Sequence, residues 1–260
     1  MTRYAVVDLE ATDAHSSQNK IIQIGIALVE GGEVVDTYTT DVNPHESLLP
    51  RIASLTGLSD RRLSKAPDFS EVAEEVRQKL EGTIFVAHNA RFDYSLLMKS
   101  LFPLGLDLEL PRVDTVELAR VVFPTFEKYG MEALSERLDL RHDQPHAALS
   151  DALATAELLL KMQDKIRELP RAVLEEIIRH SDSLLYETKE FLKEQLPYTS
   201  LKVEQLYVVH NIATRREKVK ENRHPLANSF AKNISRLGLK VRKNQEKIAE
   251  KIKEELKDYF

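Results

Sequence analysis

The sequence contains no cysteine and no tryptophan, and it has no apolar run of membrane-spanning length. Without cysteine there is no disulfide framework, no iron–sulfur cluster and no zinc site built on thiolates. The N-terminus also lacks the basic-then-apolar pattern of a secretory signal. These absences are compatible with a cytoplasmic protein that has no membrane partner, and we expect that location.

Charge is unevenly distributed along the 260 residues, whose formal net charge is -5. The stretch from Arg215 to Phe260 holds 14 Lys/Arg and 7 Asp/Glu, which leaves 23 Lys/Arg against 35 Asp/Glu in the rest of the chain. An acidic front and a basic tail indicate two units with different roles. The tail is either a solvated helical surface or a basic stripe that follows nucleic-acid phosphates.

Hydrophobic patterns alternate between strand and helix over the first two thirds of the chain. Apolar runs predict strands, the first three as an antiparallel meander, at 4–12, 21–29, 34–42, 84–87 and 112–114. Helical spacing predicts helices within 52–63, 69–80, 96–102, 116–123, 131–138 and 145–167. Interleaved strands and helices predict an α/β domain over residues 1–168. Residues 169–260 show helical patterns and no strand, so we expect an α-helical C-terminal extension there.

Two carboxylates, Asp8 and Glu10, end the first predicted strand. Side chains two residues apart on a strand share a face, so the two acids are expected side by side. Like charges at close range resist joint ionisation, and a bound Mg²⁺ or Mn²⁺ ion resolves the conflict because both ions prefer carboxylate oxygen. Such a short pattern also recurs by chance, and the acids could simply mark the exposed end of the strand.

Two further segments change that interpretation. His88-Asn89-Ala90-Arg91-Phe92-Asp93 follows the fourth strand, and His146-Ala147-Ala148-Leu149-Ser150-Asp151 opens the long helix. Together with Asp8-Leu9-Glu10, they resemble in order and spacing the three motifs of DEDD-type exonucleases in the DnaQ-like branch, histidine subtype. The resemblance covers about residues 4–165.

The resemblance implies a ribonuclease-H-like fold, in which a mixed five-stranded sheet is flanked by helices. It also implies removal of nucleotides from a free 3′ end. We expect single-stranded nucleic acid as the substrate, DNA rather than RNA. It implies two Mg²⁺ or Mn²⁺ ions held by Asp8, Glu10, Asp93 and Asp151, with His146 as general base. The chemistry agrees, because two metals clamp the attacking and leaving oxygens of a phosphodiester and an imidazole accepts a proton near neutral pH.

The same resemblance indicates residues near the substrate: Ala11, Thr12, Thr56, Leu58, His88, Asn89 and Phe92. The segment Thr56-Gly57-Leu58 resembles one that lines the pocket of the 3′-terminal nucleotide, and a helix stop at Gly57 is the simpler alternative. His88 is expected to buttress the site, and Phe92 to belong to the core rather than to stack on a base.

The chain departs from the family after its first motif. Ala11 and Asp13 stand where Thr and Gly are common, so a hydroxyl is lost and a negative charge is added. Both changes are expected to weaken contacts with the terminal nucleotide and its phosphates. Gln23 stands on a strand near the site, where the family often has an acid, and its role stays open at this stage.

The basic tail carries a second resemblance. Leu237 to Gln245, followed by a charged helix, is similar to the segment that precedes the ATP-binding loop of DinG-type helicases, some of which begin with an exonuclease domain. The loop itself needs G-x-x-x-x-G-K-[ST], which the sequence lacks. The chain therefore resembles the N-terminal piece of such a protein, and a helicase motor is an expected partner if the chain is a fragment.

Two alternative functions stay open at this stage. One is an oligoribonuclease-like trimmer of short RNA, and the other is a catalytically idle nucleic-acid-binding or docking module of a helicase. The intact set of four acids and His146 speaks against idleness. The missing phosphate-binding loop speaks against an ATPase.

Overall fold

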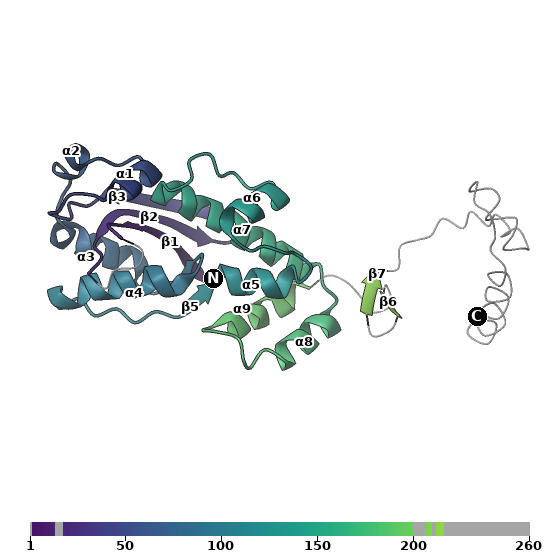
Figure 1. Ribbon diagram of the computed structural model, residues 1–260. Coiled ribbons are helices and arrows are strands. Elements are labelled where there is room, and N and C mark those ends of the chain that lie inside the picture. Colours follow the sequence, from purple (N-terminus) through teal and green to yellow (C-terminus); the bar gives the residue numbers. More distant parts are fainter. Residues whose placement is uncertain (1, 14–17, 200–205, 210–211, 216–260) are drawn as a thin grey trace, which may run out of the picture. The chain divides into compact units, whose positions relative to one another are not determined.

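The computed structural model describes residues 2–13, 18–199, 206–209 and 212–215. The chain divides into two compact units, Met1–Glu204 and Gln205–Phe260. The first unit is a β-sheet flanked by helices (Figure 1). Of the second unit, the described part is the antiparallel pair β6 (Leu206–Val209) and β7 (Ile212–Arg215).

The first unit is built on a mixed five-stranded sheet with the order β3-β2-β1-β4-β5. Its strands are β1 (Arg3–Ala11), β2 (Ile21–Glu30), β3 (Glu33–Asp41), β4 (Ile84–Ala87) and β5 (Arg112–Asp114). The first three form an antiparallel meander, and β4 and β5 add in parallel beside β1. The predicted fold class and all five predicted strands are thereby confirmed.

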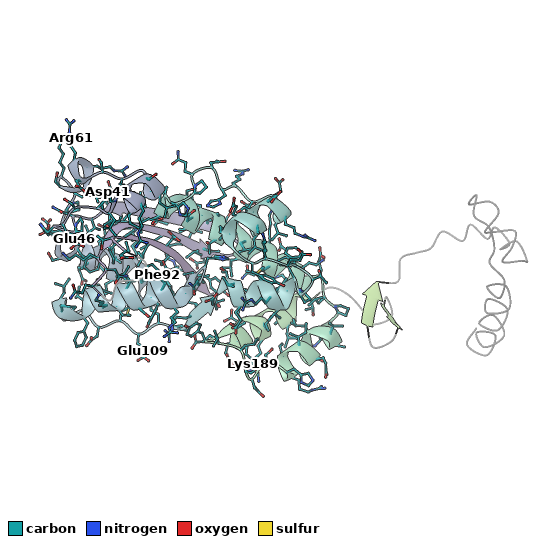
Figure 2. All side chains as sticks on the ribbon, in the orientation of Figure 1. Asp41, Glu46, Arg61, Phe92, Glu109 and Lys189 are labelled. Atoms are coloured by element: carbon teal, nitrogen blue, oxygen red, sulfur yellow. The ribbon has the colours of Figure 1, made fainter. Side chains whose placement is uncertain are left out.

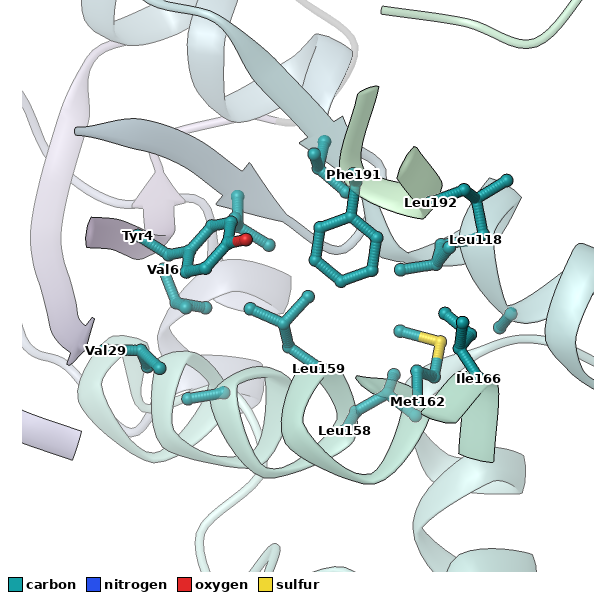
Figure 3. Close-up of a cluster of buried hydrophobic side chains, with 14 of the residues drawn as sticks. Tyr4, Val6, Val29, Leu118, Leu158, Leu159, Met162, Ile166, Phe191 and Leu192 are labelled. Atoms are coloured by element: carbon teal, nitrogen blue, oxygen red, sulfur yellow. The ribbon is translucent and has the colours of Figure 1, made fainter. Parts of the chain in front are cut away.

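Each face of the sheet has its own hydrophobic core, because successive side chains of a strand point to opposite faces. One core contains Tyr4 and Val6 of β1 together with helices α5 (Thr115–Val122), α6 (Met131–Leu138) and α7 (Ala148–Arg167) (Figure 3). The other contains Val7 and Leu9 together with helices α3 (Phe69–Leu80) and α4 (Ala90–Leu101). Asp8 and Glu10 follow the alternation of Tyr4 and Val6, so they lie on the α7 face.

Two short helices, α1 (Pro50–Thr56) and α2 (Asp60–Leu63), follow β3. Gly57 ends α1 in the left-handed conformation (φ 69°), as the sequence predicted. Leu58 packs with Ile22, Ile52 and Leu63 in a small third core. This core fastens the α1–α2 segment to β2, beside the end of β1.

The compact unit extends past residue 168, where the sequence placed the domain boundary. Helices α8 (Arg171–Arg179) and α9 (Thr188–Gln195) bury Leu174, Phe191 and Leu192 in the same core as α7. The segment between them is also tied to the sheet, since Glu187 N–H donates to Arg112 O at 3.0 Å. Apolar residues at 174–192 therefore complete the first unit, which extends to Glu204.

The helical extension expected after residue 168 is helical in α8 and α9, but β6 and β7 occur where no strand was expected. Both strands are four-residue runs rich in β-branched and aromatic residues, a composition that favours strands. Runs this short carry no periodicity that separates strand from helix. The basic tail beyond Arg215, with the expected charged helix over 244–260, lies outside the described residues. Within the described ranges, no helix is both long and apolar enough to span a membrane.

Candidate active site

Asp8 and Glu10 lie near the C-terminal end of β1, on the same face of the sheet. Between them, Leu9 N–H donates a 3.0 Å hydrogen bond to Asp93 Oδ1. Asp93 is buried, with 5% of its surface exposed, in the first turn of α4. Strand β4 runs parallel beside β1, so its C-terminal end brings α4 and Asp93 to the same edge of the sheet.

The turn between β4 and α4 is fixed by the start of α5. Asp114 Oδ2 accepts a 3.0 Å hydrogen bond from Ala90 N–H, and Thr115 Oγ1 donates to Ala87 O at 3.3 Å and lies 2.9 Å from His88 Nδ1. Asn89, between these anchors, has a left-handed backbone with φ 75°. These contacts hold the first turn of α4, and with it Asp93, against β1.

The third element of the site is the start of α7, which lies very close to β2. A Cβ on Gly25 would lie 2.2 Å from the carbonyl carbon of Ala148, so only glycine fits at this position. Gln23 Oε1 accepts a 2.9 Å hydrogen bond from Ala148 N–H, and Gln23 Nε2 donates to Asp41 Oδ1 at 2.8 Å. Gln23 therefore links the N-terminus of α7 to β3, a structural role that the sequence had left open.

Asp151, in the first turn of α7, binds the segment that precedes the helix. Its Oδ2 accepts a 2.9 Å hydrogen bond from His146 N–H, and its Oδ1 is hydrogen-bonded to Nε2 of His142. His146 is exposed and has a left-handed backbone with φ 65°. Ligand atoms of Glu10, His146 and Asp151 lie within 4.8 Å of one another. The first and third sequence motifs thus meet across β1 and α7.

Burial and neighbouring negative charges disfavour the ionised forms of Asp8, Glu10 and Asp93. Burial, and then the charges of Asp93, Asp151 and Glu10, raise the pKa of Asp8 well above its ordinary value. Burial, followed by the charges of Asp151 and Asp93, raises the pKa of Glu10 from 4.5 to about 8. Burial also raises the pKa of Asp93 from 3.8 to about 7, against the lowering effect of the Leu9 N–H bond. Divalent cations suit three such carboxylates, because the charge of the ion offsets the repulsion among them.

The residues expected to contact substrate occupy several different environments. Ala11 and Thr12 are buried, and Thr12 Oγ1 accepts a 3.1 Å hydrogen bond from Lys20 N–H, which ties the end of β1 to the residue before β2. Thr56 Oγ1 donates to Ile52 O at 2.9 Å and accepts from Leu58 N–H at 3.2 Å. Thr56 also lines a cleft of about 860 Å³ that reaches Ala147.

The remaining expected contacts lie around α4. His88 and Asn89 line a second cleft of about 540 Å³, and burial lowers the pKa of His88 below its usual range. His88 Nε2 is buried beside the Tyr129 backbone without a hydrogen bond of ordinary length. Phe92 is partly buried and packs against the core on the α4 side, as the sequence predicted (Figure 2).

The extra acid of the first motif has a cation partner. Asp13 Oδ1 accepts a 2.6 Å hydrogen bond from Arg51 Nη2 at the start of α1. The Arg51 guanidinium therefore offsets the negative charge expected to oppose the entering phosphates. The pair also connects the segment after β1 to α1.

Sequence reasoning missed three residues that shape the site: Gly25, Asp114 and His142. Gly25 had a readable signal, since an isolated glycine in a strand of branched apolar residues marks a close backbone approach. Asp114 caps α5 by accepting a 2.8 Å hydrogen bond from Val116 N–H at Oδ1, a role that an acid just before an expected helix can indicate. Its second bond, to Ala90, joins residues 24 positions apart and has no local pattern.

Comparison with known proteins agrees with this geometry. The RNase_T family model, described as exonuclease, matches residues 5–159. The 3′-5′ exonuclease DinG of Bacillus subtilis strain 168 is 40% identical over 192 residues, which cover 73% of this chain and 21% of that protein. The protein of the same name from Staphylococcus aureus strain MRSA252 is 31% identical over 265 residues, covering 98% and 29%. The chain thus spans under a third of the length of these relatives.

Solved structures show the same fold. Exonuclease X in complex with 5′ overhanging duplex DNA superposes with a TM-score of 0.50 at 25% identity, covering 63% of this chain and 92% of that one. The nuclease domain of 3′hExo, a DEDDh family member bound to rAMP, gives a TM-score of 0.56 at 18% identity, covering 62% and 92%. The resemblance drawn from the three motifs is confirmed.

Proposed function

The chain belongs to the exonuclease family, and we propose that it removes nucleotides from the 3′ end of single-stranded nucleic acid with DNA as the preferred substrate. The observation that carries this proposal is the convergence of Asp8, Glu10, Asp93 and Asp151, with His146 beside them. The two relatives named 3′-5′ exonuclease support the polarity.

Divalent metal ions are the cofactors that the family implies, and we assign them to the four carboxylates as two Mg²⁺ or Mn²⁺ ions. The donor set is oxygen-rich, clustered and destabilised by its own charge, which is the chemistry that such ions favour. When bound, two such ions offset the negative charge that builds on the attacking and leaving oxygens of a phosphodiester.

We assign the proton transfer to His146. Its side chain is exposed at the edge of the carboxylate cluster, where a water that attacks the terminal phosphodiester could deliver its proton to an imidazole nitrogen. The backbone N–H of the same residue is bound to Asp151, so the peptide is anchored while the ring is free to approach the substrate. Asp151 thus orients the residue that accepts the proton.

The substrate is assigned to the surface around the two clefts. Ala11, Thr12, Thr56 and Leu58 shape the α1 side, where we place the 3′-terminal nucleotide, and His88, Asn89 and Phe92 shape the α4 side. Leu58, Thr12 and Ala11 are buried, so we assign them to shaping the walls of the site rather than to direct polar contacts with the nucleotide. We propose that the basic tail adds affinity for the nucleic-acid backbone. We also propose that a helicase motor follows in the longer cytoplasmic protein of which this chain resembles the N-terminal part.

One digestion experiment tests reaction, polarity and substrate together. DNA and RNA single strands of the same sequence, labelled at the 5′ end, are incubated with Mn²⁺ and the wild type or Asp8→Ala. We expect a DNA ladder that shortens from the 3′ end, slower cleavage of RNA, and no cleavage by the variant. Faster RNA cleavage would favour the RNA trimmer, and an inert wild type that still binds single strands would favour the docking module.

A further inference from the structure

His142 lies outside the three motifs, yet it makes direct contact with a residue of the third. Its Nε2 is hydrogen-bonded to Oδ1 of Asp151, and the side chains are 11% and 14% exposed, respectively. An ionised carboxylate can only accept hydrogen bonds, so in this contact the imidazole donates through its N–H group. This contact is shielded from solvent and adjoins the carboxylate cluster.

Both ends of the segment from His142 to His146 are hydrogen-bonded to the same carboxylate, that of Asp151. Asp151 binds the ring of His142 through Oδ1 and the backbone N–H of His146 through Oδ2. Two weaker bonds follow the same loop, from Gln144 N–H to Ser150 Oγ at 3.3 Å and from Ala147 N–H to Gln144 O at 3.2 Å. The four bonds give residues 142–147 one arrangement against the first turn of α7.

The two hydrogen bonds leave Asp151 able to bind a cation. A carboxylate has about four lone-pair positions, of which His142 and His146 use two. The other lone pairs remain available to a cation near Asp8 and Glu10, whose pKa values the Asp151 charge helps to raise. A ligand carboxylate with one rotamer fixed by hydrogen bonds loses less conformational freedom on binding a metal than a free one.

We propose that His142 is a positioning residue: it fixes the Asp151 carboxylate toward the divalent metal site and anchors the loop that carries His146. The proposal rests on the proposed function, because it assigns Asp151 as a metal ligand. His142 itself binds neither metal nor substrate. It acts as the hydrogen-bonding partner that keeps a ligand in place.

Two substitutions of similar size separate the hydrogen bond from packing. His142→Gln keeps an N–H donor at nearly the reach of Nε2, whereas His142→Leu fills the space without a donor. His180→Ala is the matched control, since His180 is exposed on the α8 side and contacts Glu176. Mn²⁺ affinity of the full chain is measured by titration calorimetry, and folding is checked by thermal unfolding in EDTA.

We expect His142→Leu to bind Mn²⁺ about 10–100-fold more weakly, the usual effect of losing such a partner. His142→Gln should recover most of the affinity, and His180→Ala should match the wild type. Excess Mn²⁺ should restore part of the cleavage by His142→Leu, because the loop that carries His146 has lost its anchor, and none of the cleavage by His146→Ala. Should His142→Leu fail to fold, His142→Ala gives the same comparison with the space left empty.

Three results would overturn the proposal. Unchanged Mn²⁺ affinity in folded His142→Leu would make the contact incidental. Tighter binding would mean that His142 competes with the metal for Asp151. Equal losses in His142→Gln and His142→Leu would show that the imidazole acts in some other way. A wild type that binds no Mn²⁺ would instead refute the proposed function.

Discussion

Gly25 of β2 pairs with Asp8 of β1 in the antiparallel ladder, and the start of α7 occupies the space that a side chain on Gly25 would fill. The distance from a Cβ at this position to the Ala148 carbonyl carbon would be 2.2 Å, far inside van der Waals contact. The approach of Asp151 to Asp8 therefore depends on a glycine in β2, the strand beside β1.

Gly25→Ala should separate the two halves of the site. The added methyl forces α7 away from β2, and overpacking of this kind costs about 1–3 kcal/mol of stability. We also expect a smaller rise in melting temperature on addition of Mn²⁺, because Asp151 moves away from Asp8. Gly130→Ala is the control, since a Cβ there meets nothing within 4 Å. Equal behaviour of the two variants would show that the close approach is not required.

The metal-free protein should lose stability as pH rises. The pKa values of Glu10 and Asp93 are raised by burial and repulsion to about 8 and about 7, above their ordinary values of 4.5 and 3.8. At pH values between the ordinary and the raised pKa of each acid, the folded chain binds more protons than the unfolded chain. The free energy of unfolding therefore falls as pH increases. Urea midpoints in EDTA should be lower at pH 8 than at pH 5.

The same measurement with Mn²⁺ provides the control. A cation that binds only the folded state adds stability by mass action and offsets the repulsion, so the difference between pH 5 and pH 8 should shrink. In the double variant with Asp8→Asn and Asp93→Asn, Mn²⁺ should have little effect on the urea midpoint. Wild-type midpoints in EDTA that rise steadily from pH 5 to pH 8 would contradict the raised pKa values of these acids.

His146→Ala should lower turnover by about 10²–10⁴-fold, the usual contribution of a positioned general base. Stabilisation by Mn²⁺ should persist, because all four acids and the His142 contact remain. Rate and melting temperature are measured on the same preparation. Loss of both would make His146 a metal ligand, in line with its position within 4.8 Å of Glu10 and Asp151, and loss of neither would make it a bystander.

A chain cut after residue 170 should be unstable, whereas one cut after 199 should fold and keep metal-dependent cleavage. The shorter fragment lacks Leu174, Phe191 and Leu192, each at most 1% exposed. Full burial of such side chains contributes about 1.5–3 kcal/mol each, a large part of a typical total of about 5–15 kcal/mol. Circular dichroism and thermal unfolding distinguish the fragments. A stable, active 1–170 fragment would return the boundary to residue 168.

The basic tail should contribute to affinity rather than to chemistry. The proposed ligands all precede residue 152, whereas the surplus of positive charge lies within Arg215–Phe260. Binding of the 1–199 fragment to long single strands should be weaker than that of the whole chain and less sensitive to salt, because fewer counterions are released. The logarithm of the binding constant is measured against that of salt concentration. Equal slopes would mean that the tail is only a solvated surface.

Local patterns in the sequence were sufficient for most elements of the first unit. The alternation that buries Tyr4 and Val6 on one face also places Asp8 and Glu10 together, because strand geometry has a period of two residues. Gly57 ends α1, as expected for a residue that adopts the left-handed backbone conformation without strain. The short runs of β6 and β7 had no comparable period, and the sequence interpretation missed them.

The sequence by itself determined that Asp8 and Glu10 share a strand face and which faces of the strands are buried, since both follow from residue type and spacing along one element. The expected set of four acids came from the resemblance to the exonuclease family. Only the tertiary structure decided how the elements meet: α7 against Gly25, His142 on Asp151, and α8 and α9 closing the core past residue 168. These contacts join residues from different segments, and their geometry depends on the packing of whole helices against the sheet, which no local period encodes.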